Sequence, residues 1–338
     1  MNILLTSAGR RTYLINYFKT ALKGEGLVYA SNSVMTYSLL QADKYVLTPQ
    51  IYDDSYIDFL LEYCRRENIK MVISLFDIDL PILAKNKSRF DEFGITVIVS
   101  DEHVTAICND KWMTYEFLKS VGLNCPLTFK SLETAQAALN DGLISFPLII
   151  KPRWGMGSIG VIKVENEEEL DVLYKKIKRD IFSTYLKYES SASADECVII
   201  QEFLKGKEFG LDVLNDLQGN YVTTIAKQKI AMRAGETDVA QIVDNAPFIK
   251  IGMTLSENLK HLANLDVDCF VDARGNVYVL ELNCRFGGQY PFSHNAGVDF
   301  PRQIILWQKG IETDMCLLTP KIGVISCKDL NPVICEYE

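Results

Sequence analysis

The chain has 338 residues, of which 48% are hydrophobic and 23% are charged, and its formal net charge is −9 at pH 7. This composition is ordinary for a folded globular protein and excludes long disordered regions, and the length allows two or three lobes because single domains usually have about 100–200 residues. The negative charge argues against a broad phosphate-binding face, so we expect no nucleic-acid partner.

Cysteine usage and the first residues indicate the compartment. Nine cysteines occur without a CxxC pair, and several, such as Cys197 and Cys269, lie in apolar runs. They predict reduced, buried thiols of a cytoplasmic protein and no disulfide framework. The start, residues 1–7, lacks a basic region and is too short for a signal or membrane helix, so we expect a buried first strand and no membrane partner.

The first part of the chain alternates apolar runs of strand length with segments of helical period. The expected strands are 3–6, 27–30, 71–74 and 96–99, and the expected helices are 12–22 and 56–64. This order predicts a parallel sheet covered by helices. The turn 7–11 follows the first strand, where such sheets contact ligands, but it is no GxGxxG fingerprint. Two interpretations of this turn are therefore kept: Arg10 contacts a substrate, or the turn only exposes two arginines to solvent.

The alternation of strands and helices changes in character from Asp110 on, and we place a boundary between two lobes near residues 100–109. Asp110 is expected to cap a helix that ends near Gly122, and a polar stretch at 188–196 is expected to be flexible and to mark another boundary. The other expected elements are strands at 148–152, 161–164, 198–203, 209–214, 221–230, 266–272 and 277–283, and helices at 166–179 and 255–263. The predicted parts are residues 1–108, 109–192 and 193–338.

The strongest chemical signal is a mostly apolar hairpin that ends at Asn283. If residues 274–275, Arg-Gly, form a two-residue turn, Asp268 lies opposite Glu281 and Asp266 opposite Asn283. Two opposed carboxylates on apolar strands are costly unless a cation lies between them. Mg²⁺ is the expected occupant and Mn²⁺ an alternative. A surface hairpin with solvated acids is the other interpretation.

Two further segments carry weaker signals. Lys151 ends an apolar strand just before a glycine-rich loop, whose amides could wrap phosphate oxygens, although a flexible turn is an equal alternative and no Walker A motif is present. The strand 198–203 is followed by Glu208, so its edge could hold a purine while Glu208 accepts from ribose hydroxyls; a core strand with solvated charges is the alternative.

These segments together resemble one family. The motifs are, in order, Asp110-Lys111, Lys151 with its glycine-rich loop, Gln201-Glu202-Phe203 with Glu208, and Glu281-Leu282-Asn283-Cys284-Arg285. They are similar to the ATP-grasp superfamily, in particular to a single unit of the carbamoyl-phosphate synthase large subunit and its stand-alone relatives. The resemblance covers nearly the whole chain and implies an α/β and α+β fold: an N-terminal Rossmann-like parallel sheet followed by a two-lobed ATP-grasp fold.

The resemblance also implies roles for single residues. Those expected to hold ATP are Lys111, Lys151, the lid residues Gly155, Gly157 and Ser158, the adenine-binding Glu202, Phe203 and Leu204, and the ribose-binding Glu208. Those expected to hold Mg²⁺ are Asp268, Glu281 and Asn283, in agreement with the hairpin register. Lys151 and Arg285 are the expected catalytic residues, because they would neutralise charge on the transferring phosphoryl group.

The sequence departs from the family pattern in three ways. Cys284 stands where the family usually has proline, which should affect the backbone only, and Asp268 stands where relatives often carry Gln or Glu, which makes the metal site more acidic. There is neither a second ATP-grasp copy nor a glutaminase segment. This chain alone is therefore not expected to make carbamoyl phosphate from glutamine and bicarbonate.

We predict an ATP- and Mg²⁺-dependent ligase that activates a small-molecule carboxylate as an acyl phosphate and joins it to an amine, with release of ADP and phosphate. A phosphotransferase that releases an acyl or carbamoyl phosphate, and a nucleotide-binding module without turnover, are the alternatives. The candidates for substrate contact are Arg10, Arg233, Glu236 and His294, with His294 also a candidate base. The identity of the substrates is not readable, and a homodimer stays open.

Overall fold

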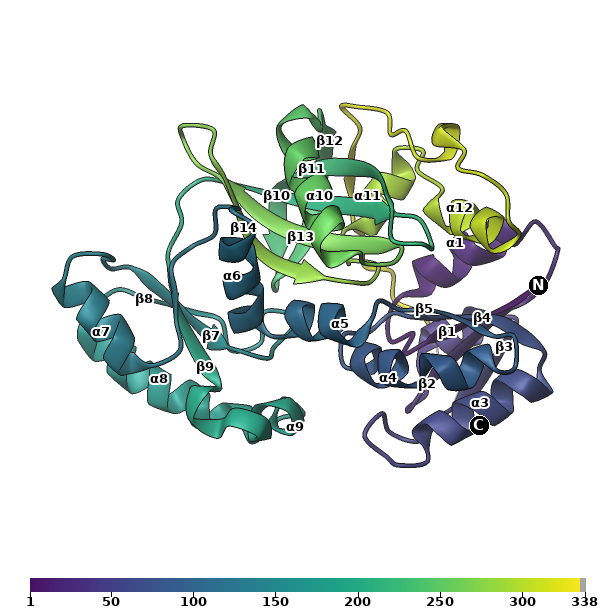
Figure 1. Cartoon of the computed structure of the whole chain (residues 1–338), viewed down its shortest axis with the longest axis horizontal. Helices are drawn as coiled ribbons and strands as arrows, with labels where there is room; N and C mark the ends of the chain where they lie inside the picture. The colour runs from purple at the N-terminus through teal and green to yellow at the C-terminus, as the bar shows by residue number, and fades with distance from the viewer. Residues whose placement is uncertain (335–338) are drawn as a thin grey trace.

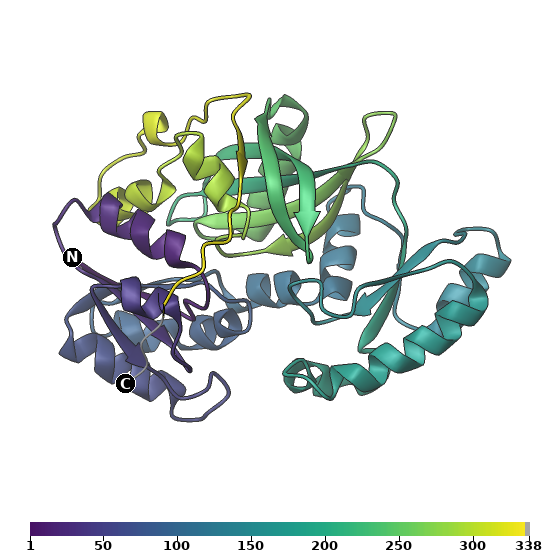
Figure 2. The same ribbon diagram turned by 180° about the vertical axis from the view of Figure 1, so that it is seen from behind.

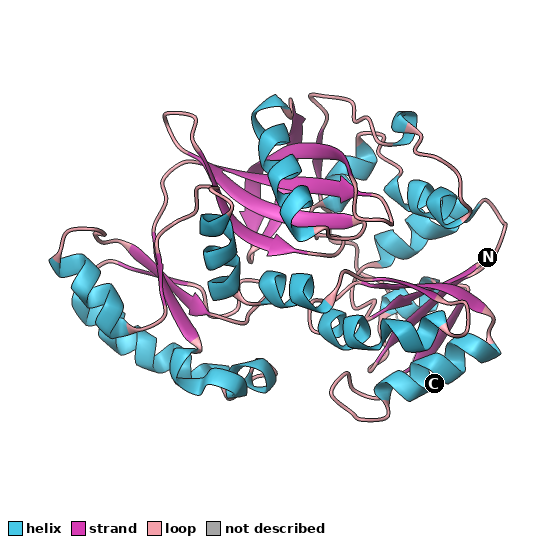
Figure 3. Ribbon diagram, viewed as in Figure 1, coloured by secondary structure: helices cyan, strands magenta, loops and turns pink. Residues whose placement is uncertain are grey.

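The computed structural model describes residues 1–334 and has three parts, each built on its own sheet (Figure 1, Figure 3). The N-terminal part is a five-stranded, wholly parallel sheet of order β3-β2-β1-β4-β5, as predicted. Its strands are β1 (Asn2–Thr6), β2 (Val28–Asn32), β3 (Lys44–Leu47), β4 (Ile69–Ser74) and β5 (Thr96–Ile98). Its helices are α1 (Thr12–Leu22), α2 (Tyr37–Gln41), α3 (Tyr56–Arg66), α4 (Asp79–Asp91) and α5 (Glu102–Asn109).

Central strand β1 explains why this part folds as a layered sheet. Ile3, Leu4 and Leu5 are fully buried, with Leu4 in one core cluster and its two neighbours in another, so both faces of the sheet are covered. The strand order reverses between β1 and β4, and ligands of such sheets bind beyond the carboxyl ends of the strands at this point. The loops after β1 and β4 lead from here toward the large lobe.

The small lobe is a four-stranded sheet of order β6-β9-β7-β8 with helices α7 and α8 against it (Figure 1). Its strands are β6 (Thr128–Phe129), β7 (Leu148–Pro152), β8 (Ile162–Val164) and β9 (Val198–Glu202). Its helices are α7 (Leu132–Asn140), α8 (Glu167–Ile181), α9 (Lys187–Ser190) and the 3-10 helix η1 (Ser191–Glu196). α6 (Lys111–Ser120) precedes them and packs against the large lobe.

Two sequence-based expectations about this lobe need correction. The strand Val198–Glu202 was expected in the large lobe, but β9 pairs with β6 and β7, so the chain crosses into the large lobe only after Glu202. The stretch 188–196 was expected to be flexible, whereas it forms the end of α9 and then η1. The path is not one continuous helix, because Ser193 within η1 has the non-helical angles φ −150° and ψ 71° and forms a kink.

The large lobe is a six-stranded antiparallel sheet of order β14-β13-β10-β11-β12-β15, covered on one face by α10 (Figure 1). Its strands are β10 (Lys207–Asn215), β11 (Tyr221–Arg233), β12 (Glu236–Val243), β13 (Asn264–Val271), β14 (Val277–Asn283) and β15 (Ile325–Cys327). Its helices are α10 (Ala246–Leu259), α11 (Tyr290–Asn295), α12 (Phe300–Gln308) and the 3-10 helix η2 (Met315–Leu317). The helix expected at 255–263 thus begins earlier: Pro247 lies in the first turn of α10, where its missing N–H costs nothing, and Lys260 ends it in the left-handed conformation.

The hydrophobic cores group the three parts unequally. Two core clusters each combine residues of the N-terminal sheet with residues of the large lobe, and α1 packs beside α12 (Figure 2). The small lobe has a separate core of its own. The small lobe can therefore move as a unit against the other two parts. Among residues 1–334 no helix is long and apolar enough to cross a membrane, and the eight cysteines described there are unpaired.

Candidate active site

A cavity of about 390 Å³ lies between the small-lobe sheet and the large-lobe sheet. Residues from both lobes line it, including every residue predicted to contact ATP: Lys111, Lys151, Gly155, Gly157, Ser158, Glu202, Phe203, Leu204 and Glu208. Asp268 and Glu281 line the same cavity, whereas Asn283 lines a narrower one next to it, together with Lys111 and Glu281. The structure thus brings together residues from each of the four sequence motifs, although Arg285 of the fourth motif lines neither cavity.

The hairpin has the predicted register at the site for an unexpected reason. Asp268 pairs with Glu281 and Asp266 with Asn283, as predicted. The turn, however, has three residues rather than two, because the Asp272 carboxylate accepts the backbone N–H groups of both Arg274 and Asn276 at 2.8 Å. A bulge between Asp268 and Cys269 offsets the extra residue and restores the register. Two deviations therefore cancel.

Lys111 and Lys151, the two lysines predicted to bind phosphates, both line the cavity. Nζ of Lys111 donates to the Gly155 carbonyl and lies 3.2 Å from Oε1 of Glu281. Nζ of Lys151 donates to Oε1 of Gln201 at 2.9 Å. Burial, with Lys111 nearby, lowers the pKa of Lys151 to about 8. Burial alone would raise the pKa of Glu281, but Lys111 and Lys151 together lower it.

A third lysine, Lys229 on β11, was missed by the sequence analysis. Its Nζ lies 2.7 Å from Asp268 and 3.8 Å from Glu208, and its side chain is 6% exposed. Burial would lower its pKa, but these carboxylates raise it above the ordinary value. The residues next to Lys229 in the sequence do not distinguish it from a lysine that is exposed to solvent. Only the alternation of side chains along strand β11, which places Lys229 on the face toward the cavity, could have predicted its position.

The donor set fits Mg²⁺ bound together with a nucleotide. Within residues 1–334 no three His, Cys, Asp or Glu side chains converge as a protein-only metal cage would require. Mg²⁺ is usually held by one or two carboxylates together with waters and substrate phosphates. Asp268 and Glu281, opposed across the hairpin and next to Asn283, supply such a set.

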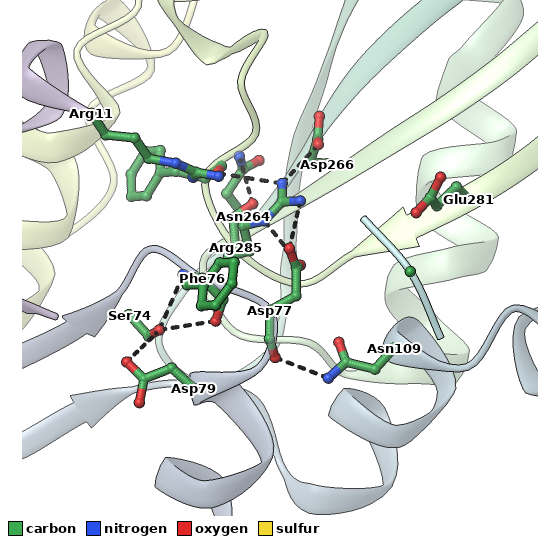
Figure 4. A network of polar contacts seen from close by, with 12 residues as sticks. Arg11, Ser74, Phe76, Asp77, Asp79, Asn109, Asn264, Asp266, Glu281 and Arg285 are labelled. Carbon is green, nitrogen blue, oxygen red and sulfur yellow. Dashed lines mark hydrogen bonds and ion pairs between the residues drawn. The ribbon is translucent and has the colours of Figure 1, made fainter. Parts of the chain in front are cut away.

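Arg285 lies outside the large cavity, at the junction with the N-terminal part (Figure 4). Its Nε is 3.0 Å from Asp77 Oδ1, its Nη2 donates to Asp77 Oδ2 at 3.0 Å and its Nη1 to Asp266 Oδ2 at 3.0 Å. Burial would lower the pKa of Arg285, but the two carboxylates raise it, while burial raises the pKa of Asp266 to about 6. This buried triad joins the β4–α4 loop to the large lobe.

Arg11 makes a second connection at this junction. Its Nη1 donates to the Phe286 carbonyl at 2.6 Å, next to Arg285 in the chain (Figure 4). The loop after β1 therefore does reach the site, through Arg11 rather than through the neighbouring Arg10, which is exposed.

The glycine-rich loop between β7 and β8 rests on the turn between β11 and β12. Gly157 and Ser158 have positive φ values of 61° and 57°, and Ser158 packs so closely against Gly235 that a Cβ there would lie 2.3 Å from its Oγ. Gly155 and Met156 line both cavities. The loop therefore covers the space next to Lys111.

The remaining substrate candidates do not converge. Arg233 pairs with Asp238, and Glu236 lies 3.1 Å from Lys328. His294 stacks on Tyr17 with ring centroids 3.5 Å apart, and burial lowers its pKa. None of these three residues lines the cavities described above.

Comparison with known proteins identifies the family. A profile described as ATP-grasp domain matches residues 108–289, more than half of the chain. The chain belongs to the ATP-grasp family. A second profile, described as PylC-like, N-terminal domain, matches residues 3–98. The resemblance and the fold class predicted from the sequence are thereby confirmed.

Individual relatives are distant. The carbamoyl phosphate synthase large chain of Pseudothermotoga lettingae is 23% identical over 271 residues, which is 75% of this chain but only 22% of that one. Among solved structures, an L-amino acid ligase from Bacillus licheniformis matches with a TM-score of 0.68 and 20% identity over 90% of this chain and 73% of its own. The biotin carboxylase domain of the Hydrogenobacter thermophilus 2-oxoglutarate carboxylase, solved with MgADP and bicarbonate, matches with a TM-score of 0.73 and 17% identity over 96% of this chain and 74% of its own. At these identities the structural likeness establishes the fold alone.

Proposed function

We propose that the protein is an ATP- and Mg²⁺-dependent ligase that activates a carboxylate as an acyl phosphate and joins it to an amine. The observation that supports this proposal most strongly is the composition of the large cavity. There, three buried lysines lie close to the opposed carboxylates of Asp268 and Glu281, and the glycine-rich loop covers them. The names of the relatives, a carbamoyl phosphate synthase and an L-amino acid ligase, support the same class of reaction.

The cavity residues divide into two groups in this proposal. Lys111, Lys151 and Lys229 bind the phosphates of ATP, while residues 202–204 hold the adenine and Glu208 accepts from the ribose. Asp268, Glu281 and Asn283 hold Mg²⁺, which neutralises charge on the phosphates when it is bound. A complex of a distant structural relative with MgADP supports this assignment.

The reaction then has two steps. A carboxylate oxygen of the substrate attacks the γ-phosphorus of ATP, the bond to the bridging oxygen breaks and ADP leaves. The amine then attacks the carbonyl carbon of the acyl phosphate, and phosphate leaves as the C–N bond forms. Lys151 and Arg285 stabilise the negative charge that develops, and the loop around Gly157 excludes water from the labile intermediate.

A substrate screen tests the proposal. Carboxylates are combined pairwise with amines in the presence of ATP and Mg²⁺, and ADP, free phosphate and product mass are measured together. A ligase needs both substrates for repeated turnover and releases ADP and phosphate in equal amounts. A phosphorylated product without free phosphate would instead indicate a phosphotransferase, and no ADP with any pair would indicate a module that only binds nucleotide.

A further inference from the structure

A narrow cavity adjoins the proposed phosphate and metal residues on the side of the N-terminal part. Its lining includes Asp77, Lys111, Glu189, Glu281 and Asn283. Its free space is about 10 Å³, at the lower limit of what one water molecule needs, so it has room for one group of about that size and no more. Two carboxylates of this lining, those of Asp77 and Glu189, have no role in the nucleotide site proposed above.

Asp77 retains capacity for a further donor. Its side chain is 9% exposed, and its Oδ1 accepts no well-formed hydrogen bond within residues 1–334, although Nε of Arg285 lies 3.0 Å away. A buried carboxylate oxygen with an unused lone pair favours a donor such as an ammonium N–H. The position of Asp77 also ties the cavity to Arg285, the proposed stabiliser of the acyl phosphate.

Glu189, on α9 at the tip of the small lobe, lines this cavity together with Asp77. The groups around it come from every element that packs there: Tyr52 after β3, Asp77 after β4, Lys111 of α6, and Tyr185 and Tyr188 of its own segment. Burial and then Asp77 raise the pKa of Glu189 to about 7, while a hydrogen bond from Tyr52 and the charge of Lys111 oppose this rise. A carboxylate that titrates near neutral pH suits proton transfer.

A contact between the small lobe and the N-terminal part holds Glu189 in this place. The rings of Tyr52 and Tyr188 stack with centroids 4.2 Å apart and an interplanar angle of 25°. Figure 1 shows α9 opposite the loop that follows β3, so this stack connects the tip of the small lobe to the N-terminal part. Since the small lobe has a separate core, a movement of that lobe away from the N-terminal part would separate the two rings and carry Glu189 away from Asp77.

We propose that Glu189 is the general base that deprotonates the amine substrate, with Asp77 as the second carboxylate that binds its ammonium group. This inference rests on the proposed ligase function. The ammonium gives one proton to the Glu189 carboxylate, and the neutral amine then forms the C–N bond as the bond between the carbonyl carbon and the phosphate oxygen breaks. The nitrogen loses a second proton in this step, and the departing phosphate takes it up. Phosphate leaves, and Glu189 returns its proton to solvent when the lobe opens.

The test compares two acceptors in the Glu189→Gln protein. Hydroxylamine is largely unprotonated at neutral pH and converts an acyl phosphate to a hydroxamate without a base, whereas the primary amine from the substrate screen arrives protonated. Glu189→Gln should lower kcat/KM with the amine roughly 10²–10⁴-fold, the usual contribution of a general base, and leave hydroxamate formation within about threefold of wild type. In wild type kcat/KM for the amine should fall as the pH drops below about 7, and this step should vanish in Glu189→Gln.

Controls separate the possible failures. Glu168→Gln removes an equally charged, exposed residue of α8 and should change neither reaction. Equal losses with hydroxylamine and with the amine would show that Glu189 serves closure or binding, and unchanged rates with both would show that it is idle; either result overturns the inference. Failure of wild type to form any hydroxamate would instead contradict the proposed function itself.

Discussion

The lysines of the large cavity and the arginine at the junction with the N-terminal part, Arg285, are held in different ways. Lys111, Lys151 and Lys229 line the large cavity. Lys151 and Lys229 have contacts at 2.9 Å and 2.7 Å that a phosphate oxygen could replace. Arg285 is bound by two buried carboxylates, one of them from the N-terminal part, and does not line that cavity. The difference implies that the lysines can exchange their present contacts for contacts with nucleotide phosphates. Arg285, in contrast, is held in one position by its two carboxylates and would act from that position.

The largest expected effect concerns stability at Arg285. Arg285→Met leaves Asp77 and Asp266 buried without their shared cation, so the free energy of unfolding should fall by about 3–5 kcal/mol, as measured by urea denaturation. Adding Asp77→Asn to this variant should recover part of the loss because one unpaired charge disappears. A loss below about 1 kcal/mol would mean that the triad is not the fixed element described here.

The second effect concerns the cavity lysine that the sequence did not reveal. Lys229→Met should weaken binding of Mg-ATP by about 1.5–3 kcal/mol, the usual value of a hydrogen bond to a charged group, as measured by calorimetry. Lys250→Met, on the exposed side of α10, is the matched control and should have no effect. Equal affinities for both variants would remove Lys229 from the proposed phosphate site.

The same contrast explains what the sequence could and could not predict. The parallel N-terminal sheet and the nucleotide residues follow from local patterns, namely alternating elements and short motifs in order. Asp77 could not be found, because its partner Arg285 is 208 positions away and only the folded chain brings the two together. The Asp268–Glu281 pairing was predicted correctly only because the three-residue turn and the bulge offset each other.

A smaller effect should appear in the pH dependence of nucleotide binding. Burial lowers the pKa of Lys151 to about 8, so its charged form is lost as the pH rises through that value. Affinity for Mg-ATP should therefore fall by about 1 kcal/mol between pH 8 and pH 9, and the slope approaches about 1.4 kcal/mol per pH unit above that. Arg at this position keeps its charge, so calorimetric titration of Lys151→Arg should give a flat profile. A flat profile in wild type would show that Lys151 does not bind phosphate.

The smallest expected effect concerns the contact between the glycine-rich loop and the turn at Gly235, compared with the turn at Gly275, which has no such contact. Gly235 and Gly275 have φ values of +80° and +85°, but only at Gly235 would an added Cβ meet Ser158. Both alanine substitutions should cost about 1 kcal/mol of stability, since neither turn suits an L side chain. Only Gly235→Ala should also speed limited proteolysis near Trp154 in the presence of Mg-ATP. Identical cleavage of the two variants would mean that the loop closes without this contact.

Isotope transfer shows whether a carboxylate is activated as an acyl phosphate in this site. The carboxylate identified in the screen is labelled with heavy oxygen, the amine is added with ATP and Mg²⁺, and the released phosphate is analysed by mass spectrometry. Because the carboxylate oxygen that attacks ATP leaves with the phosphate, each phosphate released should carry one heavy oxygen. Unlabelled phosphate formed together with the amide product would contradict it.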